Sequence, residues 1–205
     1  MLCQTLILAS LVLPKMPITI VVRQDGSGTT YNFTDYLSKI SPAWKQSFGT
    51  NFTVEWPAET QRAKGSAGAI GYVDYNYVVQ DKLNYARMTN REGRAASPSP
   101  RAFSAALSNS AWKTAGRLEE MLTEKPGPDS WPITMGTFVI VPQQTANDAA
   151  TAATLQFFTW AFMKGDQIAD GLDFVRLPDS VQGRIFKELT RITNREGRPL
   201  QWKML

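Results

Sequence analysis

The chain has 205 residues, of which 43% are hydrophobic and 20% charged, and a formal net charge of +4. This length and balance are ordinary for a globular protein that buries a core. The scattered basic residues form no stripe that would favour nucleic-acid binding. Because the chain lacks histidine and its one cysteine is Cys3, Ser-His-Asp and Cys-His mechanisms, histidine zinc sites and intrachain disulfides are all excluded.

Residues 1–16 are expected to form an atypical leader. Their apolar core, Leu6 to Leu13, is short, follows no Lys or Arg, and precedes no clean cleavage site of small residues. The core is also too short to span a bilayer. A secretion signal, a buried strand and a stray leader remain open as alternatives.

The next elements are read from hydrophobic periodicity. The β-branched run PITIVV, residues 17–22, predicts a buried strand. Apolar residues at helical spacing then predict an amphipathic helix over 29–40, with Pro42 just beyond its end. The alternating stretch FTVEWP, residues 52–57, predicts a second strand, and the small, polar residues 58–68 predict a loop.

The middle of the chain mixes aromatic and small residues. Residues 69–79 predict a strand that runs into a helix or a further strand, and residues 90–100 are typical of a linker. A short helix is expected near 103–107. The densest cluster of Pro and Gly, residues 124–132, is the preferred internal boundary.

The last third predicts one strand and two helices. The strand is ITMGTFVIVP, residues 133–142, and the first helix covers 150–165 and stops at Gly165. Asp179 is the predicted N-cap of the closing helix. Strands that alternate with helices along the chain indicate an α/β fold.

The stretch RQDGSGTT, residues 23–30, combines features that suit an anion. The first amides of a helix have no partner within the helix, and the helix dipole places partial positive charge there. Gly26 and Gly28 permit close approach of a ligand to the backbone. The hydroxyls of Ser27, Thr29 and Thr30 add hydrogen-bond donors for a tetrahedral oxyanion.

Arg23 lies just before this turn and offers a planar, bidentate group to an oxyanion. Asp25 is expected to accept from Arg23 and fix its rotamer. The alternative is structural, since Ser27 would serve equally well as a simple N-cap worth about 1 kcal/mol. The stretch is no Walker loop, because the lysine is missing, and no nucleophile elbow, because no histidine can activate Ser27.

The segment LPKMPITIVVRQDGSGTTYNFTDYLSKISPAWK resembles the central part of the periplasmic phosphate-binding proteins that serve ATP-driven phosphate importers. The resemblance continues through GAIGYVDYNYVVQ, PGPDSWPITMGTFVIV, FFTWAFMKG and LDFVRLPDSV, in the family's order, from Leu13 to the C-terminus. It implies a periplasmic-binding-protein-like (type II) α/β fold with two lobes that close on the ligand.

By position, the resemblance also implies the roles of the motif. The residues that would contact phosphate are Arg23, Ser27, Gly28 and Thr29. The residues that would support them are Asp25, Gly26 and Thr30. The family binds phosphate without catalysis, so no enzyme activity, metal or cofactor is expected, and the partner is the membrane permease of an ABC phosphate importer. The implied location is the periplasm.

The chain departs from the family at its start, where the first lobe is largely missing. The expected organisation is a phosphate-motif lobe over 17–128 and a C-terminal segment, 129–205, that in the family returns to the first lobe. An incomplete cleft leaves three alternatives: a weak half-site, a remnant or interaction protein that binds no phosphate, and half of a split receptor completed by another chain.

Overall fold

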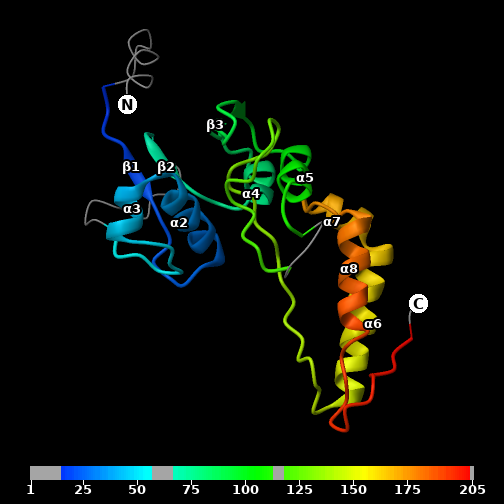
Figure 1. Cartoon of the computed structure of the whole chain (residues 1–205). Coiled ribbons are helices and arrows are strands. Elements are labelled where there is room, and N and C mark those ends of the chain that lie inside the picture. The colour runs from blue at the N-terminus through cyan, green and yellow to red at the C-terminus, as the bar shows by residue number, and fades with distance from the viewer. Residues whose placement is uncertain (1–14, 57–66, 113–117, 204–205) are drawn as a thin grey trace.

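A computed structural model describes residues 15–56, 67–112 and 118–203. The expected leader and the expected loop at 58–68 lie mostly outside these residues. The elements run in the order β1 (Thr19–Val21), α2 (Gly28–Ile40), α3 (Pro42–Ser47), β2 (Ala69–Gly71), α4 (Tyr75–Gln80), β3 (Met88–Thr89), β4 (Ala95–Ala96), α5 (Pro100–Ser108), α6 (Asp148–Lys164), α7 (Asp166–Gly171) and α8 (Asp179–Leu189). Figure 1 shows β1, β2, α2 and α3 as one group, α4 and α5 as a second, and α6 beside α8 as a third.

The first group is a parallel strand pair joined by a helical connection. Strands β1 and β2 pair in parallel, with Ile20 opposite Ile70, and α2 and α3 lie between them in the chain. Parallel strands need such a crossover connection, so the α/β class expected from the sequence is confirmed at this unit. Ile18, Ile20 and Ile70 remain exposed.

Helix α2 begins and ends where its sequence dictates. Ser27 is its N-cap, with an extended backbone and a side-chain oxygen that accepts from the Thr30 amide. At the other end, Ser41 has left the helix and caps α3, whose first residue is Pro42. The predicted helix over 29–40 is therefore confirmed.

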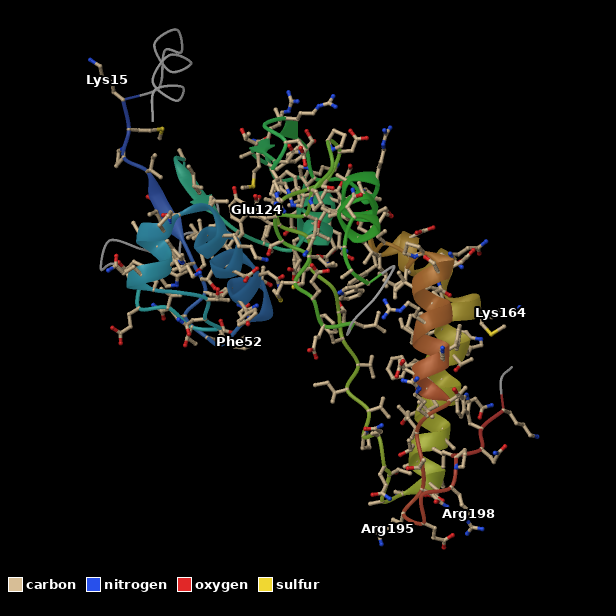
Figure 2. All side chains as sticks on the ribbon, viewed as in Figure 1. Lys15, Phe52, Glu124, Lys164, Arg195 and Arg198 are labelled. Atoms are coloured by element: carbon tan, nitrogen blue, oxygen red, sulfur yellow. The ribbon has the colours of Figure 1, made fainter. Side chains whose placement is uncertain are left out.

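The strand predicted over 52–57 is wrong for the part that is described. Residues 51–56 form bends and irregular chain that pack beside α2. Phe52 lies beside that helix (Figure 2), and its ring stacks on Tyr31 with centroids 4.4 Å apart. The carbonyl of Phe52 accepts from the amide of Ser27 at 3.1 Å. This segment supports the start of α2 and joins no sheet.

The strand predicted over 133–142 is also wrong. The segment is extended, but apart from an isolated bridge between Thr123 and Ile133 it has no strand partner among the described residues. An extended chain becomes a strand only when a neighbouring backbone accepts and donates its hydrogen bonds. Its apolar side chains stay accessible, and Ile140 is 95% exposed.

Residues 90–100 are more ordered than a linker. They include the second strand of the β3–β4 hairpin, in which Gly93 adopts a φ of +73°. The side chain of Asn90 accepts from the amides of Glu92 and Arg94 and donates to the carbonyl of Pro128 at 3.0 Å. One buried amide therefore fixes both the hairpin and the Pro- and Gly-rich stretch that follows α5.

Helices α6 and α8 pack side by side (Figure 1) and confirm both predicted C-terminal helices. The N-cap of α8 is Pro178, so the prediction of Asp179 as cap was wrong by one residue. A buried cluster of Leu155, Ile192 and Leu200 joins α6 to the chain after α8. A second cluster, formed by Leu107, Trp112, Leu122 and Val181, joins α8 to the middle of the protein.

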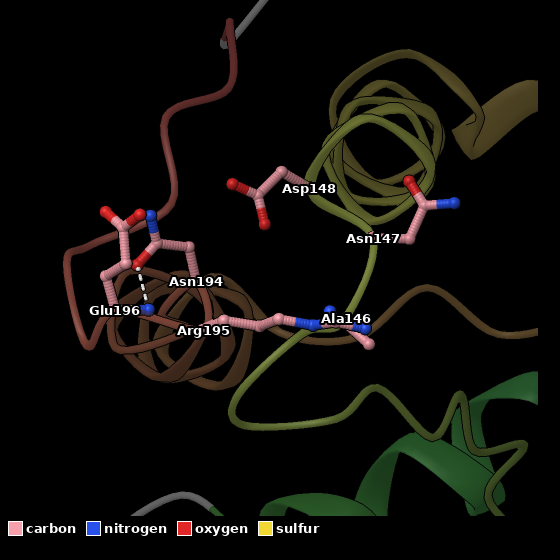
Figure 3. Close-up of a pocket in the computed structure, with 6 residues that line it drawn as sticks. All are labelled: Ala146, Asn147, Asp148, Asn194, Arg195 and Glu196. Carbon is pink, nitrogen blue, oxygen red and sulfur yellow. Dashed lines mark hydrogen bonds between the residues drawn. The ribbon is translucent and has the colours of Figure 1, made fainter.

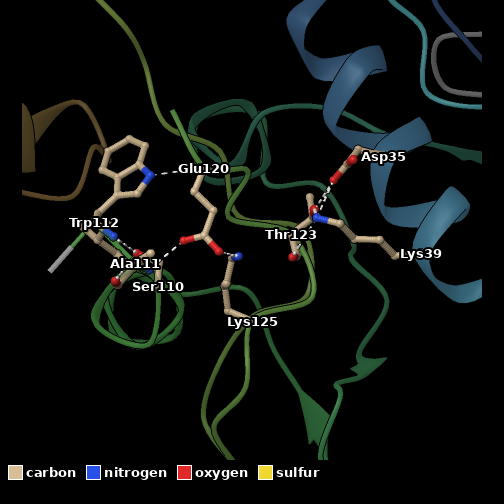
Figure 4. Close-up of polar contacts among 9 residues, drawn as sticks. Asp35, Lys39, Ser110, Ala111, Trp112, Glu120, Thr123 and Lys125 are labelled. Carbon is tan, nitrogen blue, oxygen red and sulfur yellow. Dashed lines mark hydrogen bonds and ion pairs between the residues drawn. The ribbon is translucent and has the colours of Figure 1, made fainter. Parts of the chain in front are cut away.

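Polar contacts join α2 to the segment around Thr123 (Figure 4). Lys39 lies 2.8 Å from Asp35 one turn earlier and donates to the Thr123 hydroxyl at 2.6 Å. The Thr123 hydroxyl in turn donates to Asp35. These contacts fix the C-terminal half of α2 against the middle of the protein.

The environment of the neighbouring residue Glu124 leads us to expect that folding stability depends on pH. Burial raises the pKa of Glu124 although Arg91 and Lys39 oppose the shift, and its Oε1 has no hydrogen-bond partner among the described residues. A carboxyl group with a raised pKa in the folded state stabilises the protein at low pH, and this contribution is lost as the pH rises through that pKa. Glu124→Gln should therefore stabilise the protein at pH 7.

Thermal unfolding of the wild type and Glu124→Gln between pH 4 and pH 8 measures this effect. The gain in melting temperature should shrink as the pH falls through the raised pKa. The control is Glu55→Gln, at an exposed position. A gain that does not change with pH would contradict the assignment.

Candidate functional site

The predicted motif lies where β1 leads into α2, in the first group of elements. Ser27 is buried, with 4% of its surface exposed, whereas Gly28 is exposed. The amide of Ser27 is occupied by the carbonyl of Phe52. Its side-chain oxygen accepts from the Thr30 amide at 3.4 Å, which leaves the hydroxyl proton available to donate.

The first turn of α2 presents the amides of Gly28 and Thr29. Backbone amides at these positions have no carbonyl partner within the helix. The first turn contains no acidic residue, so nothing in that turn opposes the positive end of the helix dipole. The residues of this turn therefore leave the positive end of the dipole uncompensated, and the carboxylate in contact with the turn is Asp74, which accepts from Thr29.

Arg23 and Asp25 form a bidentate pair beside the turn. The Arg23 guanidinium donates to both carboxylate oxygens, at 3.1 Å and 2.5 Å, and the side chains are 48% and 67% exposed. The hydrogen bond to Asp25 raises the pKa of Arg23, which is thus a permanent cation here. Asp25 therefore accepts from Arg23 through both carboxylate oxygens.

The hydroxyls of the two threonines are both engaged with the segment after β2. Thr29 Oγ1 donates to Asp74 Oδ1 at 3.0 Å, and Thr30 Oγ1 lies 2.8 Å from the Tyr72 hydroxyl. Thr30 has no exposed surface, so its role is to join α2 to the strand pair. Asp74 and Tyr72 were not predicted as part of this site. The available signal was that the carboxyl ends of parallel strands share one edge, which brings the residues after β1 and β2 together.

Gly26 and Gly28 leave open space around the turn, and neither is needed for an unusual backbone conformation. Neither Gly26 nor Gly28 has a positive φ. A Cβ added at Gly26 would lie 3.9 Å from Thr53, and one added at Gly28 would meet nothing within 4 Å. The turn itself therefore does not require glycine at residue 28, and the space above it is open to a ligand.

A separate hollow lies at the start of α6, and Figure 3 shows its lining. The lining residues are Ala146, Asn147, Asp148, Asn194, Arg195 and Glu196. The lining carries two carboxylates, Asp148 and Glu196, and one guanidinium, Arg195, which is the same balance of charge as Asp25, Asp74 and Arg23 give around the start of α2. No cluster of three or more acidic or cysteine side chains suited to a metal occurs in the described ranges. Likewise, none of the helices in those ranges is long and apolar enough to cross a membrane.

Comparison with known proteins gives a consistent result. The family model described as a PBP superfamily domain matches residues 6–164. The phosphate-binding protein PstS of Xylella fastidiosa strain Temecula1 is 40% identical over 185 residues, which cover 84% of this chain and 50% of the relative. The protein of the same name from Pasteurella multocida strain Pm70 is 37% identical over 199 residues, covering 92% of this chain and 58% of that protein.

A third relative, PstS of Haemophilus influenzae strain Rd, is 38% identical over 186 residues. That match covers 86% of this chain and 55% of the relative. The chain thus spans about half the length of the relatives that it matches. Each of these relatives carries the matching half and the remainder in one chain, so they give no support to a separate chain that completes the site.

Proposed function

The chain belongs to the PBP superfamily, and we propose that, like the PstS phosphate-binding proteins that it resembles, it binds inorganic phosphate at the start of α2 as a component of ABC phosphate import. The contacts are the guanidinium of Arg23, the hydroxyl of Ser27 and the amides of Gly28 and Thr29. The proposal rests on the exposed Arg23 guanidinium, which is paired with Asp25, and on the first-turn amides of α2, which have no carbonyl partner within the helix and lie a few positions later in the sequence. Asp25 orients Arg23.

The proposed chemistry is binding without catalysis. Every group assigned to phosphate is a hydrogen-bond donor, and in the part of the chain that the structure describes no hydrogen bond brings a base to the Ser27 hydroxyl for attack on phosphorus. The proposed partner is the membrane permease of the importer, and the proposed location is the periplasm, both by membership of the family. The two proposed parts are the phosphate-motif lobe over 17–128 and the C-terminal segment over 129–205.

Calorimetric titration of the whole chain with phosphate, at constant ionic strength against chloride, tests the proposal. Four or five donors on an open surface bind a dianion with a Kd on the order of 1 mM, about −4 kcal/mol. A saturable heat with a stoichiometry of one supports the function. Absence of heat up to ten times that concentration would exclude autonomous binding and favour a remnant that binds no phosphate.

Gly28→Ala separates binding from folding. A Cβ at Gly28 meets no protein atom within 4 Å, so the variant should fold with unchanged or slightly higher stability. The same Cβ occupies the open space in which an anion would meet the Gly28 and Thr29 amides, so phosphate affinity should fall by roughly tenfold, the cost of one strained or lost hydrogen bond to a charged group. Unchanged phosphate affinity in a folded variant would place the ligand elsewhere.

A further inference from the structure

We propose that the exposed side of α6 is a self-association surface, on which α6 of a second copy of this chain packs in the antiparallel direction. The starting observation is that residues 149–163 contain no charged residue, although one side of α6 is exposed. A surface helix normally carries charged or polar residues on the side opposite the core. A helix that is apolar on both sides is typical of one that is covered on both sides.

The buried and exposed sides lie opposite each other around α6. Thr151, Leu155 and Thr159 are buried, and Leu155 packs in the cluster with Ile192 and Leu200. Successive residues of a helix are turned by about 100°, so the residues on the opposite side follow from the sequence. They are all exposed, and we call them the α6 stripe: Ala149, Ala150, Ala153, Phe157 and Trp160. In Figure 1, α6 and α8 form the group farthest from β1, β2 and α2.

The α6 stripe has a flat half and a raised half. Its first half consists of alanines alone, from Ala149 to Ala153. Its second half carries Phe157 and Trp160, which are 57% and 37% exposed. Their ring centroids lie 6.2 Å apart, so the two rings form one ridge. The stripe therefore presents a shallow surface and a ridge of large side chains side by side on one helix.

These two halves complement each other when a second copy is placed antiparallel. The ridge of each helix then covers the alanines of the other, with Ala153 opposite Phe157 and Ala150 opposite Trp160. Such alternation of large and small side chains across facing positions is what close packing needs. Because both pairs are centred on the same point of α6, one two-fold axis satisfies them together, as in an isologous dimer.

The charges at the ends of α6 favour this direction. Asp148 lies in the first turn and Lys164 in the last. A parallel pair would bring like charges together at both ends and align the two helix dipoles. An antiparallel pair brings the Lys164 end of each helix to the Asp148 end of the other and opposes the dipoles.

The same features disfavour other classes of partner. Nucleic acids and anionic lipid surfaces are bound by basic faces, whereas Lys164 is the single basic residue of α6. A strongly charged protein would meet no opposite charge along 149–163. One helix side is smaller than the roughly 800 Å² that each partner buries in a stable complex. We therefore expect a weak dimer, with a Kd on the order of 100 µM.

Sedimentation velocity of the full chain, from about 5 µM to about 500 µM, tests the surface because this range brackets the expected Kd. Ala153→Lys places a charge opposite the ridge and near its own copy, and Trp160→Ala removes half of the ridge. Each should raise the Kd by about tenfold or more. Lysine is nearly as good a helix former as alanine, so Ala153→Lys should fold. The control is Ala86→Lys, which adds the same charge at an exposed position outside α6.

Circular dichroism at about 5 µM, where a Kd this weak leaves the chain monomeric, checks the fold of each variant. A dimer formed by the wild type and Ala86→Lys, and lost in both α6 variants, supports the surface. A wild type that stays monomeric, an assembly that grows beyond a dimer, or a dimer that survives either α6 substitution would overturn the inference. None of these outcomes bears on phosphate, because the α6 stripe contains no residue of the proposed phosphate site.

Discussion

Replacement of Arg23 by alanine should lower phosphate affinity by about 10- to 100-fold, because a hydrogen bond to a charged group is worth about 1.5–3 kcal/mol. Stability should hardly change, since the pair of Arg23 with Asp25 is exposed and such pairs contribute little. Calorimetric titration with phosphate and thermal unfolding measure the two effects on the same sample.

The matched control is Arg101→Ala. Arg101 forms an exposed ion pair with Asp129 at 3.0 Å, as Arg23 does with Asp25, but it is not part of the proposed site. The Arg101→Ala substitution removes the same charge from the chain as Arg23→Ala does. Because it removes no proposed contact with phosphate, it should leave phosphate binding unchanged. Equal losses in the two variants would mean that phosphate responds to net charge and that Arg23 makes no specific contact.

Leu155→Ala should cause a large loss of folding stability. Leu155 is 1% exposed and joins α6 to Ile192 and Leu200. Truncation of a fully buried leucine typically costs about 2–5 kcal/mol, from lost burial and from the cavity that remains. Urea unfolding followed by circular dichroism should show a lower midpoint.

Phe157→Ala provides the comparison on the same helix. The Phe157→Ala substitution removes more apolar volume than Leu155→Ala does. Because Phe157 is 57% exposed, its truncation should lower the free energy of unfolding far less. If Phe157→Ala destabilised the chain as much as Leu155→Ala, that face of α6 would be buried in solution and the packing described here would be incomplete.

The helices were the most predictable part of the fold. The spacing of apolar residues in α2 and α6, and the capping and stop residues Ser27, Pro42 and Gly165, are local signals that the structure confirms. The expected periplasmic-binding-protein-like α/β fold is confirmed by the match to the PBP superfamily domain.

The strands were less predictable because pairing is not local. PITIVV and ITMGTFVIVP are similarly apolar, yet β1 finds β2 whereas the segment at 133–142 has no strand partner in the described ranges. FTVEWP alternates like a strand but is drawn into contact with α2 through Phe52. Periodicity cannot reveal which extended segment will find a neighbour.

Only the contiguous part of the candidate site could be predicted from the sequence. The contiguous motif from Arg23 to Thr30 could be found because its parts are adjacent in the sequence. Asp74 and Tyr72 were missed because their contacts with α2 span more than 40 positions in the chain. The hydrogen bond from the Thr29 hydroxyl to Asp74 was not expected from the sequence either, because only the three-dimensional contact reveals it.

The most direct test of the central claim is an NMR titration of the ¹⁵N-labelled chain with phosphate. The amide signals of Gly28 and Thr29 should shift along saturable curves with one shared Kd. The amides of Asp148 and Ala149, at the start of α6, should not shift, because Asp148 in that first turn opposes an anion. Unshifted signals from Gly28 and Thr29 at saturating phosphate, or equal shifts at both helices, would contradict a phosphate site at the start of α2.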